Sequence, residues 1–257
     1  MSVTIPTTTL ALPDREHKPR LRGITMVIDT GMATRTLDDI LASHADLVDM
    51  VKLGWGTCLV TSDLSRKLDI LRSYDIEYFF GGTLFEKFAL QQRFDEFRQF
   101  LRAHRCSHVE VSNGTLPMSS EQKGVYIEKL STDFSVFAEV GFKDPNRSEA
   151  LTAGEWVSQV KADFAAGAHM VILEARESGR SGIGGPDGKP RTAVLEQLIA
   201  QVDSTRLLFE APTRELQTYL IDSLGANVNL GNIAVDGIVN LETMRLGLRS
   251  DTFFPAG

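Results

Sequence analysis

Short apolar or β-branched runs recur along this chain, and a segment with helical periodicity follows each of them. Alternating strands and helices are the sequence signature of stacked βα units around a parallel sheet. Eight strands, each followed by a helix, in a chain of 257 residues favour a (β/α)8 TIM barrel over a doubly wound open sheet. The predicted strands are residues 23–29, 50–54, 77–82, 108–114, 136–141, 169–176, 206–212 and 227–232.

The length of the chain agrees with one barrel, so we expect a single catalytic domain over residues 23–257. Residues 1–22 precede the first predicted strand and are rich in threonine and proline. We expect them to form a mobile arm that a partner subunit could order. Within the domain, residues 84–104 have the periodicity of one long helix.

Charge and composition argue against several classes of partner. The formal net charge is -7 and the basic residues form no runs, so a nucleic acid is not an expected partner. No apolar run approaches the roughly 20 residues of a membrane span, and the start of the chain lacks a signal-peptide pattern. Cys58 and Cys106 have no CxxC spacing, which argues against a disulfide framework or a zinc site and predicts a reducing cytoplasm.

Polar residues collect at the predicted strand ends, which in a barrel face the mouth of the active site. Four consecutive strands, the fourth to the seventh, end in glutamate. A single glutamate at a strand end would more often form a salt bridge with a loop, but four in sequence order are harder to explain in this way. Because side chains alternate along a strand, Glu110 and Ser112 share one face of their strand, and so do Glu174 and Arg176. The strand-end residues are Asp29, Lys52, Glu110, Ser112, Asn113, Glu139, Lys143, Glu174, Arg176, Glu210, Asn229 and Asn232.

Clustered carboxylates repel one another unless a cation or a shared proton compensates their charge. A divalent metal ion is the simplest compensation. Oxygen ligands without a supporting histidine or cysteine suit a hard cation, and the five histidines show no ligand spacing. The sequence therefore predicts a Mg²⁺ site at the mouth of the barrel.

An anionic substrate is expected beside such a metal. Lys52, Lys143 and Arg176 lie at or just beyond strand ends, and residues 177–185, ESGRSGIGG, could offer backbone N–H groups to a phosphate or a sulfonate or be a flexible connection. Trp55, in the segment KLGWGT, is an aromatic residue in a loop at the same end. It either plugs the top of the barrel or contributes to the site.

Several long motifs resemble the phosphosulfolactate synthase family, whose enzymes add sulfite to phosphoenolpyruvate early in coenzyme M biosynthesis. The resemblance runs in order over residues 23–253. It implies a (β/α)8 barrel, a Mg²⁺-dependent carbon–sulfur lyase that forms (2R)-2-phospho-3-sulfolactate, and a homo-oligomer such as a trimer. The motifs are GITMVIDTG, VKLGWGT, FFGGTLFEKF, VEVSNGTLPMS, AEVG, VILEARESGRSGI, LLFEAPTRELQTYLI and GANVNLGNIAVDGIVNLETMRLGLRSDTF.

The resemblance also implies roles for the strand-end residues. Glu110, Glu139 and Glu174 are the expected metal ligands, direct or through water, and Glu210 is the next candidate. Lys143, Lys52 and Arg176 are the expected catalytic residues, Lys143 as a general acid whose pKa nearby cations lower. The residues expected to bind the substrate are Asn113, Ser112, Arg180, Glu210, Asn229, Asn232 and Asp29.

One position departs from the family pattern. The fifth strand of the family continues E-V-G-K-K, whereas this chain reads EVGFK, so Phe142 replaces the first lysine. Either Lys143 serves as the proton donor, or the chain adds a different nucleophile to phosphoenolpyruvate. A barrel without catalytic activity that binds a phosphorylated ligand or another protein is the remaining alternative.

Overall fold

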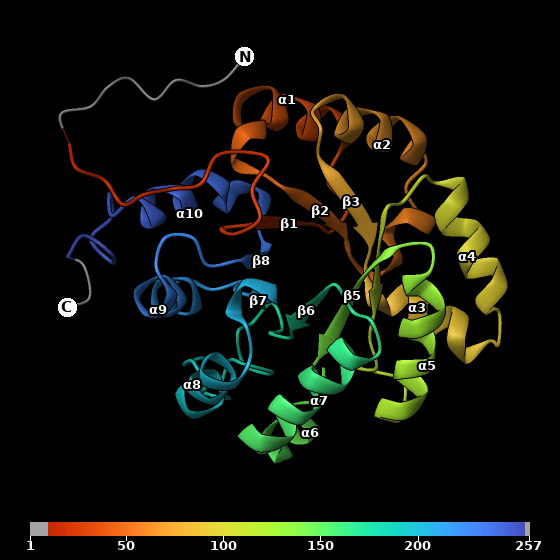
Figure 1. Ribbon diagram of the computed structural model, residues 1–257. Coiled ribbons are helices and arrows are strands. Elements are labelled where there is room, and N and C mark those ends of the chain that lie inside the picture. Colours follow the sequence, from red (N-terminus) through yellow and green to blue (C-terminus); the bar gives the residue numbers. More distant parts are fainter. Residues whose placement is uncertain (1–9, 255–257) are drawn as a thin grey trace.

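The chain folds into a ring of parallel strands surrounded by helices (Figure 1). The structure is a computed structural model and describes residues 10–254. Its eight strands confirm the predicted (β/α)8 barrel. The strands are β1 Thr25–Asp29, β2 Met50–Leu53, β3 Glu77–Phe80, β4 His108–Val111, β5 Ser135–Val140, β6 Met170–Leu173, β7 Leu207–Glu210 and β8 Leu230–Ile233.

Hydrogen-bonded pairing joins the strands in the order β3-β2-β1-β8-β7-β6-β5-β4. Every pair is parallel, and β3 and β4, the two ends of this order, lie in contact and bring the ring close to closure. A ring of parallel strands places all eight carboxyl ends at one mouth. The side chains that follow each strand can therefore meet, although they are far apart in the sequence.

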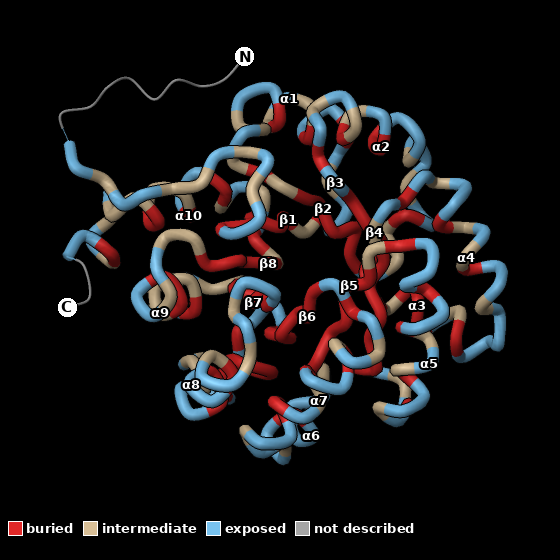
Figure 2. The backbone as a smooth tube through the Cα atoms, in the orientation of Figure 1, coloured by how far each residue is buried: buried red, intermediate tan, exposed pale blue. Residues whose placement is uncertain are grey.

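The helices lie outside the ring, and Figure 2 shows that each α-helix carries both buried and exposed residues along its backbone. Their buried apolar residues belong to the core cluster between helices and strands. Capping boxes begin two of the helices: Ser119 with Gln122, and Thr152 with Glu155. The α-helices are α1 Thr34–His44, α2 Leu64–Ser73, α3 Gly82–Leu90, α4 Phe94–Ala103, α5 Ser120–Ser131, α6 Pro145–Ala150, α7 Ala153–Ala165, α8 Thr192–Gln201, α9 Arg214–Leu224 and α10 Ile238–Arg245. None of the helices in residues 10–254 has the length and apolar character to cross a membrane.

The interior of the barrel has an apolar layer below a charged layer. Because side chains alternate along a strand, residues two positions apart share a face. Met50 and Lys52 follow each other in this way on β2, and Phe137 and Glu139 do so on β5. The lower, apolar cluster consists of Ile24, Met26, Met50, Phe79, Phe137, Met170, Ile172 and Leu208. This layer seals the barrel beneath the charged residues.

Two predicted segments differ from the structure. Residues 84–104 form two helices, α3 and α4, because Gln92 adopts a left-handed backbone with φ of 57° between them. The last strand starts at Leu230, three residues later than predicted, because Asn227 and Asn229 use their side chains to bind neighbouring backbone. A periodicity count does not detect a turn that a single residue makes.

The described part of the predicted arm, residues 10–22, packs against the amino-terminal end of the barrel. Arg15 hydrogen-bonds to Glu242, to Asn227 and to the carbonyl oxygen of Gly23. Lys18 donates to the carbonyl oxygens of Ala45 and Val48 at 3.2 and 2.7 Å. The remainder of the predicted arm, residues 1–9, lies outside the described residues.

Replacing Arg15 tests whether these contacts hold the arm. Its side chain is only 7% exposed, so Arg15→Ala would leave Glu242 without its buried partner. We expect a loss of about 2–4 kcal/mol in the free energy of unfolding, measured by urea denaturation. The exposed Arg35, replaced in the same way, is the control and should change it by less than about 0.5 kcal/mol. Equal effects of the two substitutions would contradict the anchoring role.

Candidate active site

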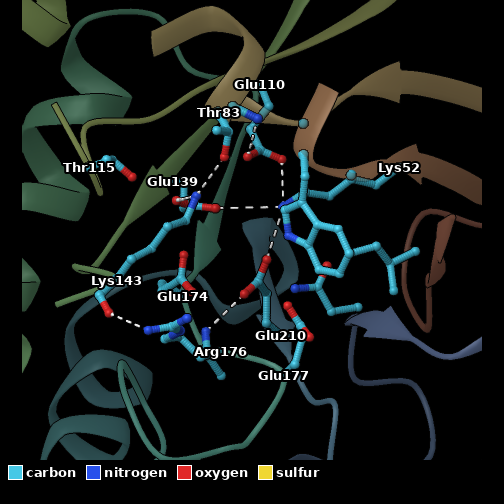
Figure 3. Close-up of a pocket in the computed structure, with 17 residues that line it drawn as sticks. Lys52, Thr83, Glu110, Thr115, Glu139, Lys143, Glu174, Arg176, Glu177 and Glu210 are labelled. Atoms are coloured by element: carbon cyan, nitrogen blue, oxygen red, sulfur yellow. Dashed lines mark hydrogen bonds and ion pairs between the residues drawn. The ribbon is translucent and has the colours of Figure 1, made fainter. Parts of the chain in front are cut away.

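A cavity of about 250 Å³ opens at the carboxyl ends of the strands (Figure 3). Every strand, or the residue directly after it, contributes to its wall, so the mouth is the point at which the whole barrel converges. The contributing residues, from β1 to β8, are Ile28, Lys52, Gly81, Glu110, Glu139, Glu174, Glu210 and Asn232. Six of these eight residues have polar side chains, as the strand ends predicted.

Lys52 lies at the centre of the charged layer. Its Nζ is 2.8 Å from Glu110 Oε2, 3.0 Å from Glu210 Oε1 and 3.6 Å from Glu139 Oε2. Burial by itself lowers the pKa of Lys52, but the three carboxylates outweigh it and raise that pKa well above its ordinary value. Lys52 is therefore a permanent positive charge in the floor of the cavity.

Lys143 is the second cation of the cavity and projects from the segment that follows β5. Its Nζ is 3.1 Å from Thr83 Oγ1 and 3.8 Å from Glu139 Oε1. The charge of Glu139 outweighs burial and raises the pKa of Lys143 above its ordinary value. The sequence had suggested the opposite direction, because it did not show that a carboxylate would be the nearest charged neighbour.

The four carboxylates are in unequal environments. Burial raises the pKa of Glu110 to about 7, although Lys52 opposes the shift. Burial would also raise the pKa of Glu139, but Lys143 and Lys52 lower it to about 2. Burial and the charges of Glu139 and Glu210 raise the pKa of Glu174 well above its usual range. The surroundings therefore favour the ionised form of Glu139 and disfavour the ionised form of Glu174.

Glu139, Glu174 and Glu210 are arranged so that they could hold a metal ion. Each offers one oxygen, and the three oxygens lie within 4.8 Å of one another. Neither carboxylate oxygen of Glu139 has a hydrogen-bond partner among the described residues. The grouping differs from the sequence expectation, which placed Glu110 in the ligand set and Glu210 in the substrate set.

Glu110 is anchored to the backbone at the start of α3. Its Oε1 accepts a hydrogen bond of 2.7 Å from the backbone N–H of Gly82, at the start of α3. This close approach needs a glycine, because a Cβ at residue 82 would lie 2.7 Å from that oxygen and 2.3 Å from Ser112 Oγ. Glu110 therefore joins Lys52 to α3. It is not one of the three carboxylates, Glu139, Glu174 and Glu210, whose oxygens lie close together.

Of the residues that the sequence assigned to substrate binding, Glu210 and Asn232 line the cavity. Asn232 adopts a left-handed backbone with φ of 52°, and its buried Oδ1 has no hydrogen-bond partner among residues 10–254. A strained residue with a free acceptor at a strand end is typical of a functional position. It remains a substrate-binding candidate.

The other five residues of that group do not line the cavity. Asp29 forms a 2.6 Å ion pair with Lys67 of α2, Ser112 Oγ donates to Glu86 of α3, and Asn113 donates to the carbonyl oxygen of Met118. These three side chains fasten the loops around the mouth. Their strand-end positions were correct, but a helix or loop residue takes each polar group.

Asn229 and Arg180 lie outside the cavity for other reasons. Asn229 precedes β8, at the amino-terminal end of the barrel, where it accepts from the backbone N–H of Ile24 and donates to the carbonyl oxygens of Thr205 and Leu207. The later start of β8 moved it to the end opposite the mouth. Arg180 is exposed on the loop after β6.

Phe142, the departure from the family pattern, does not point into the cavity. Its ring packs against the guanidinium of Arg147, 3.9 Å from the ring centroid, and its carbonyl oxygen accepts from Ser181 Oγ. Lys143, the next residue, lines the cavity instead. The lysine that the chain keeps is therefore the one that faces the charged cluster.

Sequence reasoning missed Thr83, Thr115 and Glu86. Thr83 and Thr115 line the cavity, and Glu86 binds the backbone N–H groups of Thr115 and Leu116. Thr83 follows the third predicted strand, so its place near a strand end was the available signal. Glu86 is in the middle of a helix, and nothing in its sequence neighbourhood predicts that it is buried.

The sequence of this chain is similar to those of known enzymes. The model of the (2R)-phospho-3-sulfolactate synthase (ComA) family matches residues 13–251. The chain belongs to the phosphosulfolactate synthase family of enzymes. The phosphosulfolactate synthase of Bacillus subtilis strain 168 is 45% identical over 95% of this chain and 98% of its own length. That of Methanothermobacter thermautotrophicus is 41% identical over 93% of this chain and 95% of its own length.

Solved structures of barrel enzymes share the fold. The 3-hexulose-6-phosphate synthase of Salmonella typhimurium superposes with a TM-score of 0.54, over 86% of this chain and 99% of that protein. The sequence identity is 11%, so the similarity concerns the barrel alone. Membership of the phosphosulfolactate synthase family places the strand-end carboxylates and lysines in an enzyme.

The role of Lys52 can be tested by Lys52→Met. Without this charge, the pKa values of Glu110 and Glu210 are raised further above the 4.5 of an unfolded glutamate, and Glu110 reaches about 7 even with Lys52 present. A folded state with raised carboxyl pKa values binds more protons than the unfolded state, so its stability falls as pH rises through that window. We expect the variant to lose about 3 kcal/mol or more at pH 8 and less at pH 5, by urea denaturation.

The matched control for Lys52→Met is Lys87→Met, because Lys87 is exposed on α3. It should show little loss at either pH. A loss for Lys52→Met that is equal at pH 5 and pH 8 would contradict the electrostatic role of Lys52.

Proposed function

We propose that this enzyme adds sulfite to phosphoenolpyruvate in a Mg²⁺-dependent reaction that gives (2R)-2-phospho-3-sulfolactate. The observation that carries the proposal is a pair of lysines, the buried Lys52 and the half-buried Lys143, beside four strand-end carboxylates in one cavity. Family membership supports the same activity, because the relatives named above are phosphosulfolactate synthases.

The reaction sets the requirements for the site. The sulfur of sulfite forms a bond to the methylene carbon of the enol phosphate, and the π electrons of the double bond move towards C2 and the neighbouring carboxylate. A proton is then added to C2, and no group leaves. Two anions must approach each other, and negative charge accumulates at the substrate carboxylate, so the site needs fixed positive charge and a proton donor.

The carboxylates of the cavity fit Mg²⁺. Fully ionised, the four buried glutamates exceed the two lysines of the cavity by two negative charges, which one divalent cation would balance. Glu139, Glu174 and Glu210 would hold the ion, and all offer the hard oxygen ligands that Mg²⁺ prefers. When bound, Mg²⁺ supplies positive charge where the substrate carboxylate gains electron density.

Lys143 is the proposed proton donor to C2. It lines the cavity, and its raised pKa keeps it protonated at neutral pH. The carbanion next to a carboxylate is a strong base, so an ammonium group can deliver the proton to it. Thr83 Oγ1 accepts a hydrogen bond from Nζ and would fix its direction.

The other polar residues would hold the two anions. Lys52 provides a fixed charge in the floor, and Arg176 reaches the rim from β6, where its guanidinium donates to the carbonyl oxygen of Lys143 at 3.3 Å. Asn232 would bind a substrate oxygen through its amide N–H₂ group. These interactions orient the substrate and the nucleophile before the bond forms.

We also propose that the enzyme is a homo-oligomer, as the resemblance implies. Large apolar side chains are exposed beside the mouth: Leu59, Val60 and Leu90 are 61, 83 and 59% exposed. They border a groove that a second copy could cover.

The proposed reaction is tested by ³¹P NMR of the protein with phosphoenolpyruvate, sulfite and Mg²⁺. We expect a new phosphate-ester resonance that requires sulfite and disappears with EDTA. Glu174→Gln removes one of the proposed ligands, so it should abolish this resonance and weaken Mg²⁺ binding by calorimetry. An unchanged phosphoenolpyruvate signal in the wild-type sample would contradict the proposal and direct the search to another nucleophile.

The role of Lys143 is tested by Lys143→Met. Loss of a general acid typically costs about 10²- to 10⁴-fold in rate. We expect kcat to fall within this range, with KM for phosphoenolpyruvate changed much less. The exposed Lys161, on α7, replaced by methionine is the control and should retain full activity. A kcat within threefold of wild type for Lys143→Met would exclude it as the proton donor.

A further inference from the structure

Trp55 is the feature of the mouth that the proposed mechanism does not use. It follows β2 by two residues, and it lines the cavity that contains Lys52. The residue is 50% exposed, which is unusual for the largest apolar side chain. A tryptophan in this place has to be explained by its position over the cavity or by its contacts outside it.

The backbone at this point is strained. Trp55 has φ of 50° and ψ of 25°, and Gly56 has φ of 70° and ψ of 22°, so two consecutive residues are left-handed. A bulky residue in this conformation costs on the order of 1–3 kcal/mol, and such strain is concentrated at functional sites. The strain turns the chain sharply just after Lys52 and keeps the Trp55 ring at the rim of the cavity.

The position of Trp55 within the ring is opposite that of Arg176. In the strand order, β2 and β6 are four positions apart in a ring of eight, so the loops that carry Trp55 and Arg176 face each other across the mouth. One rim therefore offers a guanidinium and the other a rigid aromatic surface. An anion bound to the lysines below would be enclosed between them.

On its outer side, Trp55 borders the apolar groove formed by residues such as Leu59, Leu84 and Pro117. Trp55 also lines the charged cavity, so its side chain lies between the groove and the cavity. A side chain in this position can cover a bound molecule and exclude water from it. Exclusion of water strengthens every charge interaction inside the cavity.

We propose that Trp55 is a positioning residue that covers the bound enol phosphate and closes the mouth opposite Arg176. This inference rests on the proposed function, because it concerns a phosphorylated carboxylic acid bound in the same cavity. It adds a residue that determines how tightly and in what orientation that substrate is held.

Intrinsic fluorescence tests the cover directly. The chain has two tryptophans, and the other one, Trp156, is fully buried. Phosphoenolpyruvate with Mg²⁺ but without sulfite should shift the emission of Trp55 to shorter wavelength and reduce its quenching by acrylamide. Trp55→Phe retains only Trp156, so the same titration should leave its emission unchanged.

Steady-state kinetics provide the second measurement. Trp55→Ala removes the cover and should raise KM for phosphoenolpyruvate at least tenfold, with a smaller change in kcat. Trp55→Phe retains an aromatic ring and should restore KM to within threefold of wild type. Val239→Ala removes an exposed apolar side chain from α10, away from the cavity, and is the control, with unchanged kinetics.

The outcomes separate this inference from the proposed reaction. If the wild-type enzyme forms product but its emission does not respond and Trp55→Ala has a normal KM, the cover is wrong and the reaction stands. If no product forms with sulfite, a specific response of Trp55 to phosphoenolpyruvate still supports the cover. A KM raised equally by Val239→Ala would show that the effect is not specific to the Trp55 ring and would overturn the inference.

Discussion

The ion pairs that Lys52 makes inside the barrel are the constraint on which the site depends. Four carboxylates are buried at the carboxyl ends of the strands, and buried carboxylates cannot all ionise without compensation. Lys52 contacts Glu110, Glu139 and Glu210 at 2.8–3.6 Å, and so it allows them to be close together. Lys52 compensates only part of the negative charge, and the pKa of Glu174 is therefore raised.

This incomplete compensation connects stability with function. An apolar layer of methionine, phenylalanine, isoleucine and leucine beneath the charges keeps water out from below. The excess negative charge above it would suit the Mg²⁺ that we propose, because Glu139, Glu174 and Glu210 lie close enough to share a cation. The free protein therefore holds a strained electrostatic arrangement that a bound cation would relieve.

Buried polar contacts outside the cavity hold the mouth in shape. Lys67 of α2 pairs with Asp29, and Lys123 of α5 pairs with Asp163 of α7 and donates to the carbonyl oxygen of Glu139. Each contact ties a helix to a strand end or to a neighbouring helix. These contacts thereby fix the direction of the charged residues, because catalytic groups must be held within a small error in position.

The sequence by itself determined the barrel and most of its charged layer. Strand and helix periodicity are local properties, so the eight strands could be read along the chain, and strand-end position identified Lys52, Lys143 and the glutamates that line the cavity. The family motifs agreed with this reading. The exceptions were local too: Asn227 and Asn229 looked like strand residues because their spacing is that of a strand.

Only the tertiary structure decided which polar groups remain free to act. Three predicted residues lie at strand ends but are already paired. Asp29 accepts a hydrogen bond from Lys67, Ser112 donates to Glu86, and Asn113 donates to the carbonyl oxygen of Met118. In the folded chain, Phe142 packs against Arg147 outside the cavity, whereas Lys143 lines it. The fold also raises rather than lowers the pKa of Lys143, and it groups Glu210 with Glu139 and Glu174. The physical reason is that pairing and pKa depend on distances between residues far apart in the chain, which no local pattern encodes.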